Sequence, residues 1–279
     1  GVTPQINAIE INGRVLRDIS ILQLCKNTFP KGLWWMKSRF SEASEDYDMH
    51  MVMNNTTGNY MSSRPWDGTA NITDAYRTYT APTNNCVGWC WSAPESWTGA
   101  TNYVANSGYR NTAAGFCMWQ YTGNGVRGNT TSHGLSSAPQ FMIIQRTDSN
   151  NRSVVYHYLH SANDNFPEVA PIPNQNYTIS LDNGTVYGPD YAFWGNTAPS
   201  DTLVTIGESS TVNSSGGTYQ AYAWHEVEGY SKFGRYAGTE SSQTTTADGP
   251  YVYLGFKPSL IMIKGIGQAE GWLIRDSTR

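Results

Sequence analysis

Apolar residues in this chain come in short runs separated by polar turns, and one arrangement of runs occurs three times. Each copy has a proline, an apolar run that ends at Lys or Gln, a polar turn and a second apolar run. The copies begin with FPKGLWWMKSR (29–39), SSAPQFMIIQRTD (136–148) and GFKPSLIMIKGIG (255–267), and their second runs are MHMVMNN, SVVYHYLHS and GWLIRDS. Two apolar runs around a polar turn are typical of a β-hairpin, so the pattern predicts a hairpin in each copy.

The similarity extends upstream of the second and third hairpins. NCVGWCW (85–91) matches TYQAYAWH (218–225) in its alternating aromatic residues. FCMWQYTGNG (116–125) matches KFGRYAGTES (232–241) in the spacing of a tyrosine and a glycine. Further strands of one copy therefore have counterparts in the next.

Aligning Leu33, Phe141 and Leu260 gives copy spacings of 108 and 119 residues. Internal similarity at a regular spacing indicates repeated structural units. We therefore expect a lead segment, two β units, and the start of a third unit that continues past Arg279. The expected boundaries are 1–27, 28–135, 136–254 and 255–279.

Helical periodicity is nearly absent from the chain. Only RVLRDISILQLCKN (14–27) places apolar residues at helical spacing, at Val15, Ile19 and Leu22, and this segment fits two short strands as well. Elsewhere, breakers such as NG, TGNG and SSGG separate short alternating runs. The pattern predicts an all-β fold of tandem antiparallel β-sandwich units, of jelly-roll or lectin-like type, with long polar loops.

Composition narrows the classes of function. Only 14 % of the residues are charged, compared with about 25 % in an average soluble protein, while 13 % are aromatic. Such a polar, weakly charged and aromatic-rich chain is typical of β-rich extracellular or virion proteins. A net charge of −4 without any Lys/Arg cluster argues against nucleic-acid binding. No apolar run reaches the ~18 residues of a membrane span, so we expect no membrane insertion.

The four cysteines do not form a recognisable site. Cys86 and Cys90 would share one face of a strand about 13 Å apart, which is too far for a disulfide between them. None of the five histidines accompanies Cys25, Cys86, Cys90 or Cys117 in a zinc-like spacing. We interpret the cysteines as small buried apolar residues.

The densest group of titratable residues lies in YAWHEVEGYSKFGRYAG (222–238). In a strand, Glu226 and Glu228 would lie on one face and His225 on the other, which disfavours a His–Glu catalytic dyad. We expect the strand to leave its sheet with both carboxylates in solvent, and GYSKFG to form a turn in which Lys232 pairs with one glutamate. The chain has no nucleophile elbow, phosphate loop, HExxH or CxxC motif, so we expect no enzyme and no cofactor.

The remaining acidic residues give no convincing metal site. Asp190, Asp201 and Glu208 lie in polar loop segments, and Asp182-Asn183-Gly184 is an ideal type I′ turn. A calcium loop needs oxygen ligands at more alternating positions than this turn supplies. We therefore predict no metal ligands.

The histidines outside the 222–238 segment also give no defined site. His133 precedes a predicted strand and is interpreted as structural. His157 and His160 lie at a strand end without any obvious partner and stay unassigned.

Aromatic residues among Gly, Ser, Asn and Thr are the better candidates for binding. The segment 92–112 lacks apolar alternation and is predicted to be a long surface loop, a class of loop that is often functional. Flat rings beside adaptable polar groups suit a glycan or protein surface, although the same rings could cover the end of a sandwich or a subunit contact. The hypothetical ligand-binding residues are Trp97, Tyr103, Tyr109, Trp66 and Trp194. The tryptophans within predicted strands are expected in the core, namely Trp34, Trp35, Trp89, Trp119 and Trp224.

The C-terminal part of the chain resembles a known repeat family. GNTAPSDTLVTIGESSTVNSSGGTYQAYAWHEVEGYSKFGRYAG and GPYVYLGFKPSLIMIK, within 195–264, are similar to a repeat of tail-fibre-like and other virion surface proteins of tailed bacteriophages, especially marine ones. The segment 122–148 resembles the same family at His133, Gly134, Leu135, Ala138 and Pro139. Matching residues in the C-terminal part are Glu226, Glu228, Gly229, Ser231, Lys232, Phe233, Gly234, Tyr236, Gly238, Phe256, Pro258, Ile263, Lys264, Trp272, Asp276 and Ser277.

The resemblance covers about 28–279 and is looser in the first unit, where Pro30 and Lys31 are swapped relative to the family. It implies a virion component, part of a tail fibre or other surface appendage, that contributes to host-surface recognition. It also implies a homo-oligomer, expected to be a trimer, in contact with other virion proteins and with a host cell-surface glycan or protein. The alternatives are a capsid-decorating fibre protein of the same family and a secreted, lectin-like carbohydrate-binding module.

Overall fold

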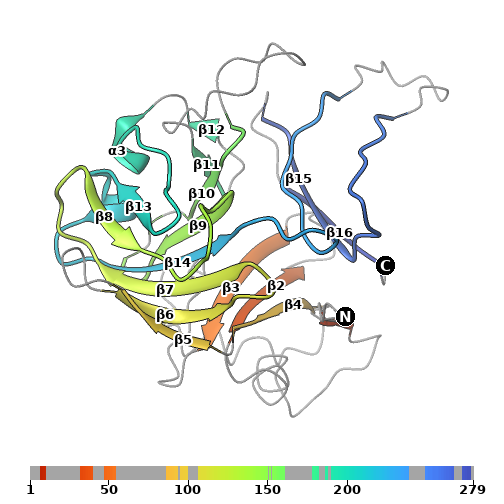
Figure 1. The fold of residues 1–279 in the computed structure, drawn as a ribbon, viewed down its shortest axis with the longest axis horizontal. Coiled ribbons are helices and arrows are strands. Elements are labelled where there is room, and N and C mark those ends of the chain that lie inside the picture. The colour runs from red at the N-terminus through yellow and green to blue at the C-terminus, as the bar shows by residue number, and fades with distance from the viewer. Residues whose placement is uncertain are drawn as a thin grey trace.

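The structure is a computed structural model. It describes residues 7–10, 32–39, 47–54, 86–93, 95–99, 106–149, 151, 153–160, 178–181, 186–187, 190–238, 249–266 and 272–277. In these ranges the regular structure consists of antiparallel β-strands and two one-turn helices (Figure 1). The predicted all-β, antiparallel fold is confirmed at this level.

The elements follow one another in a nearly unbroken series of strands. They are β1 (Asn7–Glu10), β2 (Gly32–Arg39), β3 (Tyr47–Asn54), β4 (Cys86–Ser92), β5 (Glu95–Thr98), β6 (Asn106–Asn111), β7 (Phe116–Thr122), β8 (Asn129–Ser132), β9 (Phe141–Arg146), β10 (Val154–His157), β11 (Thr178–Ser180), β12 (Val186–Tyr187), α3 (Tyr191–Trp194), β13 (Leu203–Ile206), α4 (Ser210–Asn213), β14 (Thr218–Trp224), β15 (Leu260–Lys264) and β16 (Trp272–Asp276). The possible helix at 14–27 lies outside the described residues.

The strands form two larger sheets and two separate pairs. One sheet has the order β1-β4-β2-β3, and the other has the order β12-β11-β10-β9-β14-β7-β6-β5. Strand β13 pairs with β8, and β15 pairs with β16. The three predicted hairpins are confirmed, because β2 pairs with β3, β9 with β10 and β15 with β16.

The internal repeat also appears in the strand order. In the four-stranded sheet, β4 lies between β1 and β2, and in the eight-stranded sheet β14 lies between β7 and β9. The register repeats too, because Trp91 lies opposite Leu33 and Trp224 lies opposite Phe141. The series β1-β4-β2-β3 and β7-β14-β9-β10 are therefore two copies of one arrangement, as the similarity of 85–91 to 218–225 indicates.

Neighbouring strands in the larger sheet come from both predicted units. Strand β14, within 136–254, pairs with β7, within 28–135. It also pairs with β9 on its other side. The unit boundaries themselves stay a prediction.

Both faces of the eight-stranded sheet are buried around its central strands β7, β9, β10 and β14, and side chains alternate between the two faces. Along β14, Tyr219, Ala221 and Ala223 face one side, whereas Tyr222 and Trp224 face the other. This is the alternation expected of a strand covered on both faces, and it confirms the predicted assignment of faces up to Trp224. Of the tryptophans expected in the core, the described side chains of Trp119 and Trp224 are buried.

Different elements cover the two faces (Figure 1). On one face, Trp119, Tyr219, Ala221 and Ala223 of the sheet form a core with residues of α3, β13 and α4, and we call it the helix-side core. The residues from these covering elements are Phe193, Trp194, Val204, Ile206 and Val212. On the other face, Met118, Ile143, Tyr222 and Trp224 belong to a second core, which we call the hairpin-side core. It packs against β15 and β16 through Leu260, Met262, Trp272 and Ile274. The indole Nε1 of Trp272 donates to the carbonyl of Ser180 at 3.1 Å, which anchors the C-terminal hairpin to the edge of the sheet near β11.

Cys117 is a core residue, as predicted. Its side chain is 0 % exposed and belongs to the helix-side core. Burial raises the pKa of the thiol to about 12, so the thiol is neutral and unreactive at physiological pH. The side chains of Cys25, Cys86 and Cys90 lie outside the described residues.

Candidate functional surface

The stretch 92–112 contains two paired strands, which corrects the predicted long loop. Strand β5 pairs with β6, and β6 pairs with β7. Pairing with β7 satisfies the backbone of β6, so a segment rich in Ser, Gly and Asn can form a strand without apolar alternation. Strand β5 is an edge strand, and three of its four residues are exposed.

Trp97 and Tyr109 lie on opposite faces of this sheet and do not form one site. Trp97 lies opposite Gly108 and packs against Trp119 of the helix-side core, with ring centroids 6.3 Å apart at 63°. Tyr109 lies opposite Met118 and packs against the hairpin-side core. Both rings are partly buried, so each offers only part of its surface to a ligand.

Trp194 is a core residue, contrary to the expectation that it offers its ring to a ligand. It is 1 % exposed and lies edge-to-face against Tyr156, with ring centroids 5.5 Å apart. The one-turn helix α3 turns its ring inward, with Asp190 at the N-terminus accepting a hydrogen bond from the Ala192 N–H. The other two candidates, Trp66 and Tyr103, lie outside the described residues.

The segment that begins EVEGYSK leaves the sheet, as expected, and forms a turn. Strand β14 ends at Trp224, and the His225 N–H donates to the carbonyl of Gly115. Val227 then forms an isolated bridge with Ser231. The ring of His225 contacts the Glu226 backbone carbonyl through Nδ1 and the Ser136 hydroxyl through Nε2, rather than either carboxylate.

The predicted pairing of Lys232 with a glutamate is wrong. Glu226 Oε1 instead accepts a hydrogen bond from the Phe233 N–H at 2.9 Å. Within the described part of the chain, Lys232 forms no ion pair with Glu226 or Glu228. The Glu226 carboxylate therefore stabilises the turn through a backbone group.

The described acidic residues of the polar loops have structural partners. Glu208 forms an ion pair with Arg127 at 2.6 Å, and Asp201 Oδ1 accepts from the Ala138 N–H at 3.1 Å. Asp182 lies outside the described residues. Among the residues that the structure does describe, no three His, Cys, Asp or Glu side chains come together as a metal site. No helix in the same residues is long and apolar enough to cross a membrane.

Two histidines are held neutral by the fold. The Leu135 N–H donates to Nδ1 of His133, and the other ring nitrogen bonds the Ser200 carbonyl at 3.0 Å, so His133 has a structural position. Burial lowers the pKa of His133. Burial, with smaller effects from His160 and Arg235, lowers the pKa of His157 to about 4.

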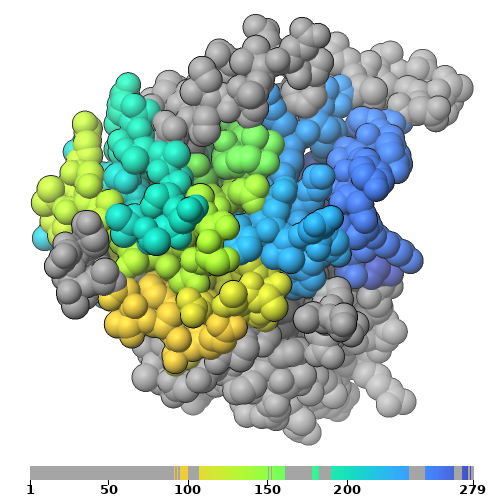
Figure 2. Space-filling model, in the orientation of Figure 1, coloured from red at the N-terminus to blue at the C-terminus, as the bar shows by residue number. Residues whose placement is uncertain are grey.

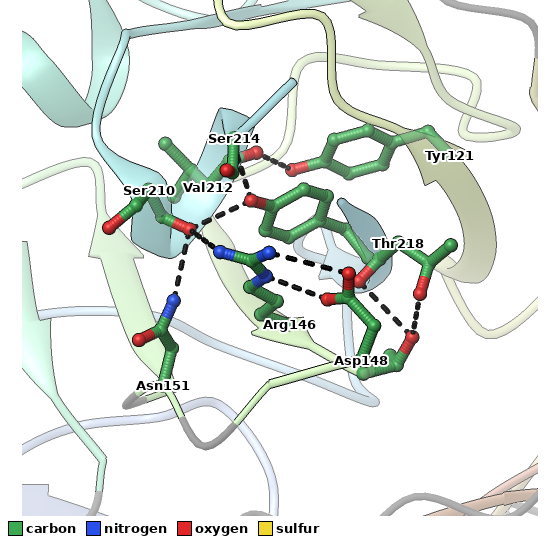
Figure 3. A network of polar contacts seen from close by, with 10 residues as sticks. Tyr121, Arg146, Asp148, Asn151, Ser210, Val212, Ser214 and Thr218 are labelled. Carbon is green, nitrogen blue, oxygen red and sulfur yellow. Dashed lines mark hydrogen bonds and ion pairs between the residues drawn. The ribbon is translucent and has the colours of Figure 1, made fainter. Parts of the chain in front are cut away.

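A polar network joins α4 to the end of the sheet (Figure 3). Arg146 forms an ion pair with Asp148 at 2.7 Å and donates to the Ser210 carbonyl at 3.3 Å. Its guanidinium lies 5.9 Å from the centre of the Tyr219 ring. Every group in this network has a protein partner, so we interpret the network as a structural connection between α4, β9 and β14.

Most of the exposed large apolar side chains of the described residues lie towards the C-terminus. Tyr251 is 87 % exposed and Tyr253 is 73 % exposed. Six large apolar residues of this region are exposed, and we call them the C-terminal apolar set: Tyr236, Tyr251, Val252, Tyr253, Ile261 and Leu273. Figure 2 shows the last described residues, in dark blue, at one side of the molecule next to the lighter blue of residues 225–238.

The sequence contains a signal for this surface that isolated aromatic residues do not show. The YVYLGF stretch (251–256) alternates aromatic and aliphatic residues like a buried strand. In the structure, 251–254 form no strand and remain largely exposed. Only the tertiary structure could show that nothing among the described residues covers them.

Comparison with known proteins places the chain in a family without naming an activity. No curated protein matches it. No solved structure matches it. Residues 42–279 match a family described as a Domain of unknown function (DUF7483), so the chain belongs to that family.

Proposed function

We propose that this chain is a structural protein of a tailed-bacteriophage virion, part of a tail fibre or other surface appendage, that contributes to recognition of the host surface. The proposal starts from the sequence resemblance within 195–264. It includes an extracellular place on the particle, contacts with other virion proteins, and a homo-oligomer that we take to be a trimer. It includes no catalytic activity.

The observation that carries the proposal is the repetition of strand order and register in β1-β4-β2-β3 and β7-β14-β9-β10. A repeated unit with sheet edges can be extended by adding further units, which suits an elongated appendage. We further propose that the units are tandem β-sandwiches of jelly-roll or lectin-like type. The burial of both faces of the larger sheet around its central strands supports this arrangement.

The exposed tyrosines support the recognition role. Tyr251 and Tyr253 offer flat, amphipathic rings with hydroxyl groups, which suit contact with a glycan or a protein at low entropic cost. They replace Trp194 as candidate binding residues, because Trp194 is buried. Trp97 and Tyr109 keep partial exposure and stay secondary candidates.

Binding of the labelled chain to host cells tests the recognition role. The double variant Tyr251→Ala/Tyr253→Ala is expected to reduce binding at least about tenfold, which corresponds to roughly 1.4 kcal/mol. Tyr191→Ala is the matched control, because Tyr191 is 51 % exposed but belongs to α3. Equal binding by the double variant and the control would remove the tyrosines from the proposal.

The mass of the chain in solution tests the appendage role. Light scattering after size exclusion is expected to give three times the mass of one chain. A stable monomer that binds one defined glycan would instead favour the carbohydrate-binding module. Antibody labelling of intact particles distinguishes a tail location from capsid decoration.

A polysaccharide turnover assay tests the absence of catalysis. Turnover that disappears in Glu226→Gln or Glu228→Gln would overturn the non-enzymatic proposal. The contact of Glu226 with the Phe233 N–H makes Glu226→Gln conservative for the turn, since the amide oxygen can accept the same hydrogen bond.

A further inference from the structure

The segment 226–238, which we call the strap, follows β14 and forms a turn with an irregular tail. The tail, 232–238, matches β7 in sequence through the spacing of Tyr236 and Gly238. Strand β7 lies inside the eight-stranded sheet, whereas 232–238 form no strand and Tyr236 to Gly238 are exposed. A segment with a strand-like sequence is therefore held in another conformation by its contacts.

Phe233 attaches the strap to the end of the sheet. Its ring stacks on Phe141 of β9, with ring centroids 5.7 Å apart at 8°, and packs against the hairpin-side core. Its N–H donates to Glu226 Oε1 at 2.9 Å, and its carbonyl accepts a hydrogen bond from the Tyr158 hydroxyl at 3.3 Å. Side chains rather than a β-ladder bind these backbone groups, so the strap can leave the sheet without breaking a strand pair.

His157 lies beside this attachment. It is the last residue of β10 and lies opposite the uncharged Phe141 of β9. Its ring meets the Phe141 ring edge-on, with ring centroids 6.3 Å apart, and stacks on the Tyr158 ring at 5.6 Å. Phe141 and Tyr158 both contact Phe233, so His157 and the strap are supported by the same two residues.

The charges around His157 disfavour a proton on its ring while the strap is in place. Among the described residues, the titratable and charged groups near the ring come from the end of β10 and from the strap: Tyr158, His160, Arg235 and, beside Tyr158, Glu226. Burial, with smaller effects from His160 and Arg235, lowers the pKa of His157 to about 4. Protonated His157 would carry a positive charge close to Arg235 of the strap.

We propose that the strap is an acid-sensitive switch, which is closed on the sheet end at neutral pH and is opened by protonation of His157. In the open form Phe233 leaves Phe141, and water reaches the His157 ring. Opening uncovers both phenylalanine rings and moves Arg235 away from the new charge. The switch depends on these contacts of the fold and not on the virion role.

The direction of the pH dependence follows from the two states of His157. In the closed form the pKa is about 4, whereas a ring in water titrates near the ordinary value of 6.5. Between these values the open form binds a proton that the closed form does not, so acidification favours opening. The ratio of open to closed molecules is expected to rise by up to about tenfold per pH unit in this window.

Hydrogen exchange of the full chain, corrected for the intrinsic rate at each pH, measures the opening. The N–H groups of Tyr230, Ser231 and Phe233 are bonded within the strap and report its opening, while amides of β14 report global unfolding. Strap protection is expected to be lower than that of β14 and to fall as pH is lowered from 6.5 to 4.5. Equal protection in both segments, or strap protection that does not change with pH, would overturn the proposal.

Two asparagine variants assign the trigger. His157→Asn keeps an acceptor for the Leu159 N–H but cannot titrate, so it is expected to remove most of the pH dependence of strap protection. His133→Asn is the matched control, because His133 is also buried and its Nδ1 accepts from the Leu135 N–H in the same local geometry. It is expected to keep the pH dependence. A native slope in His157→Asn would contradict the assigned trigger.

Tyr158→Phe tests the attachment independently of the titration. The variant removes the hydrogen bond to the Phe233 carbonyl, so strap protection is expected to fall about two- to tenfold at every pH, with an unchanged slope. Tyr222→Phe is the matched control, because the Tyr222 hydroxyl is buried without a hydrogen-bond partner among the described residues. Strap protection should be native in this control. Native strap protection in Tyr158→Phe would overturn the assigned attachment.

Discussion

Gly134 lies where the indole ring of Trp97 leaves no room for a side chain. A Cβ atom at this position would lie 2.4 Å from Nε1 and 2.6 Å from Cδ1 of Trp97. Trp97 in turn packs on Trp119 and cannot move freely. Gly134 therefore allows the β5 edge strand to pack on the helix-side core.

The first prediction concerns this contact. Gly134→Ala is expected to lower the free energy of unfolding by about 1–3 kcal/mol, because the added methyl group overpacks the site. Chemical denaturation measures the change. Gly234→Ala is the matched control, since a Cβ there meets no atom within 4 Å, and it should be close to neutral.

A second variant distinguishes overpacking from backbone effects at the same site. Trp97→Ala removes the ring that the new methyl group would meet. In that background, Gly134→Ala should cost much less than it does in the native chain, since contacting residues are not additive. Equal costs in both backgrounds would mean that Trp97 is not the cause.

The second prediction concerns His157 and pH. The folded state keeps this ring neutral with a pKa of about 4, whereas the usual value is 6.5. Between these values the unfolded chain binds a proton that the folded chain does not, so stability falls as pH falls through this window. Each pKa unit corresponds to about 1.4 kcal/mol. Melting temperatures measured from pH 7 to pH 4.5 should therefore decrease.

His157→Asn assigns that pH dependence. The Leu159 N–H donates to Nδ1 of His157 at 3.2 Å, and the oxygen of asparagine can accept the same bond without titrating. The variant should show a shallower decrease of melting temperature on acidification, with a remainder from His133. The same slope in both proteins would contradict the assignment.

At the scale of elements, two tyrosines hold α4 against the sheet (Figure 3). Tyr219 accepts a hydrogen bond from the Ser214 N–H at 2.6 Å and donates to the Ser210 carbonyl at 2.7 Å. Tyr121 donates to the Val212 carbonyl at 2.7 Å. The hydroxyl groups thus satisfy backbone groups at both ends of a helix that is only one turn long.

The third prediction follows from this connection. Tyr219→Phe is expected to lower the free energy of unfolding by about 1–3 kcal/mol, because it leaves the Ser214 N–H and the Ser210 carbonyl with one partner fewer. Exchange of backbone amides in α4 should become faster. Both quantities can be measured on the same protein.

Tyr222→Phe is the matched control on the same strand. The Tyr222 hydroxyl is buried without a hydrogen-bond partner among the described residues. Its removal should be neutral or stabilising, because an unpaired buried polar group is costly. A loss as large as that of Tyr219→Phe would contradict the assigned role of the two hydroxyl groups.

Strands were predictable from the sequence where one short segment contains both the apolar pattern of a strand and the strand with which it pairs. The hairpins β2–β3, β9–β10 and β15–β16 were predicted because each has two apolar runs around one turn. Strands β5 and β6 were missed because their residues are mostly polar and the backbone of β7 provides their pairing. Candidate aromatic residues on these strands could not be placed on a face without knowing that pairing.

At the scale of the whole molecule, an aromatic contact among the described residues joins the two larger sheets. Trp91 of β4 and Trp224 of β14 lie edge-to-face, with ring centroids 6.1 Å apart at 74°. Trp91 packs against the hairpin-side core although its strand belongs to the four-stranded sheet. This contact couples the two copies of the repeat.

The fourth prediction tests that coupling. The native chain is expected to unfold in one cooperative calorimetric transition, and Trp91→Ala to separate it into two. Trp97→Ala is the control, because Trp97 packs on Trp119 of its own sheet and its loss should lower the melting temperature without dividing the transition. Loss of a packed tryptophan typically costs about 3–5 kcal/mol, so either change is measurable. One transition in both variants would show that other contacts couple the sheets.

The sequence by itself determined the local features: antiparallel β structure, three hairpins, the alternation along β14 and the similarity of β4 to β14. These features follow from the side-chain period of a strand and from turn residues, which act over a few positions. Only the tertiary structure decided that Trp194 is buried and that Tyr251 and Tyr253 are exposed. Burial depends on which distant segments pack together, and no short stretch of sequence specifies that.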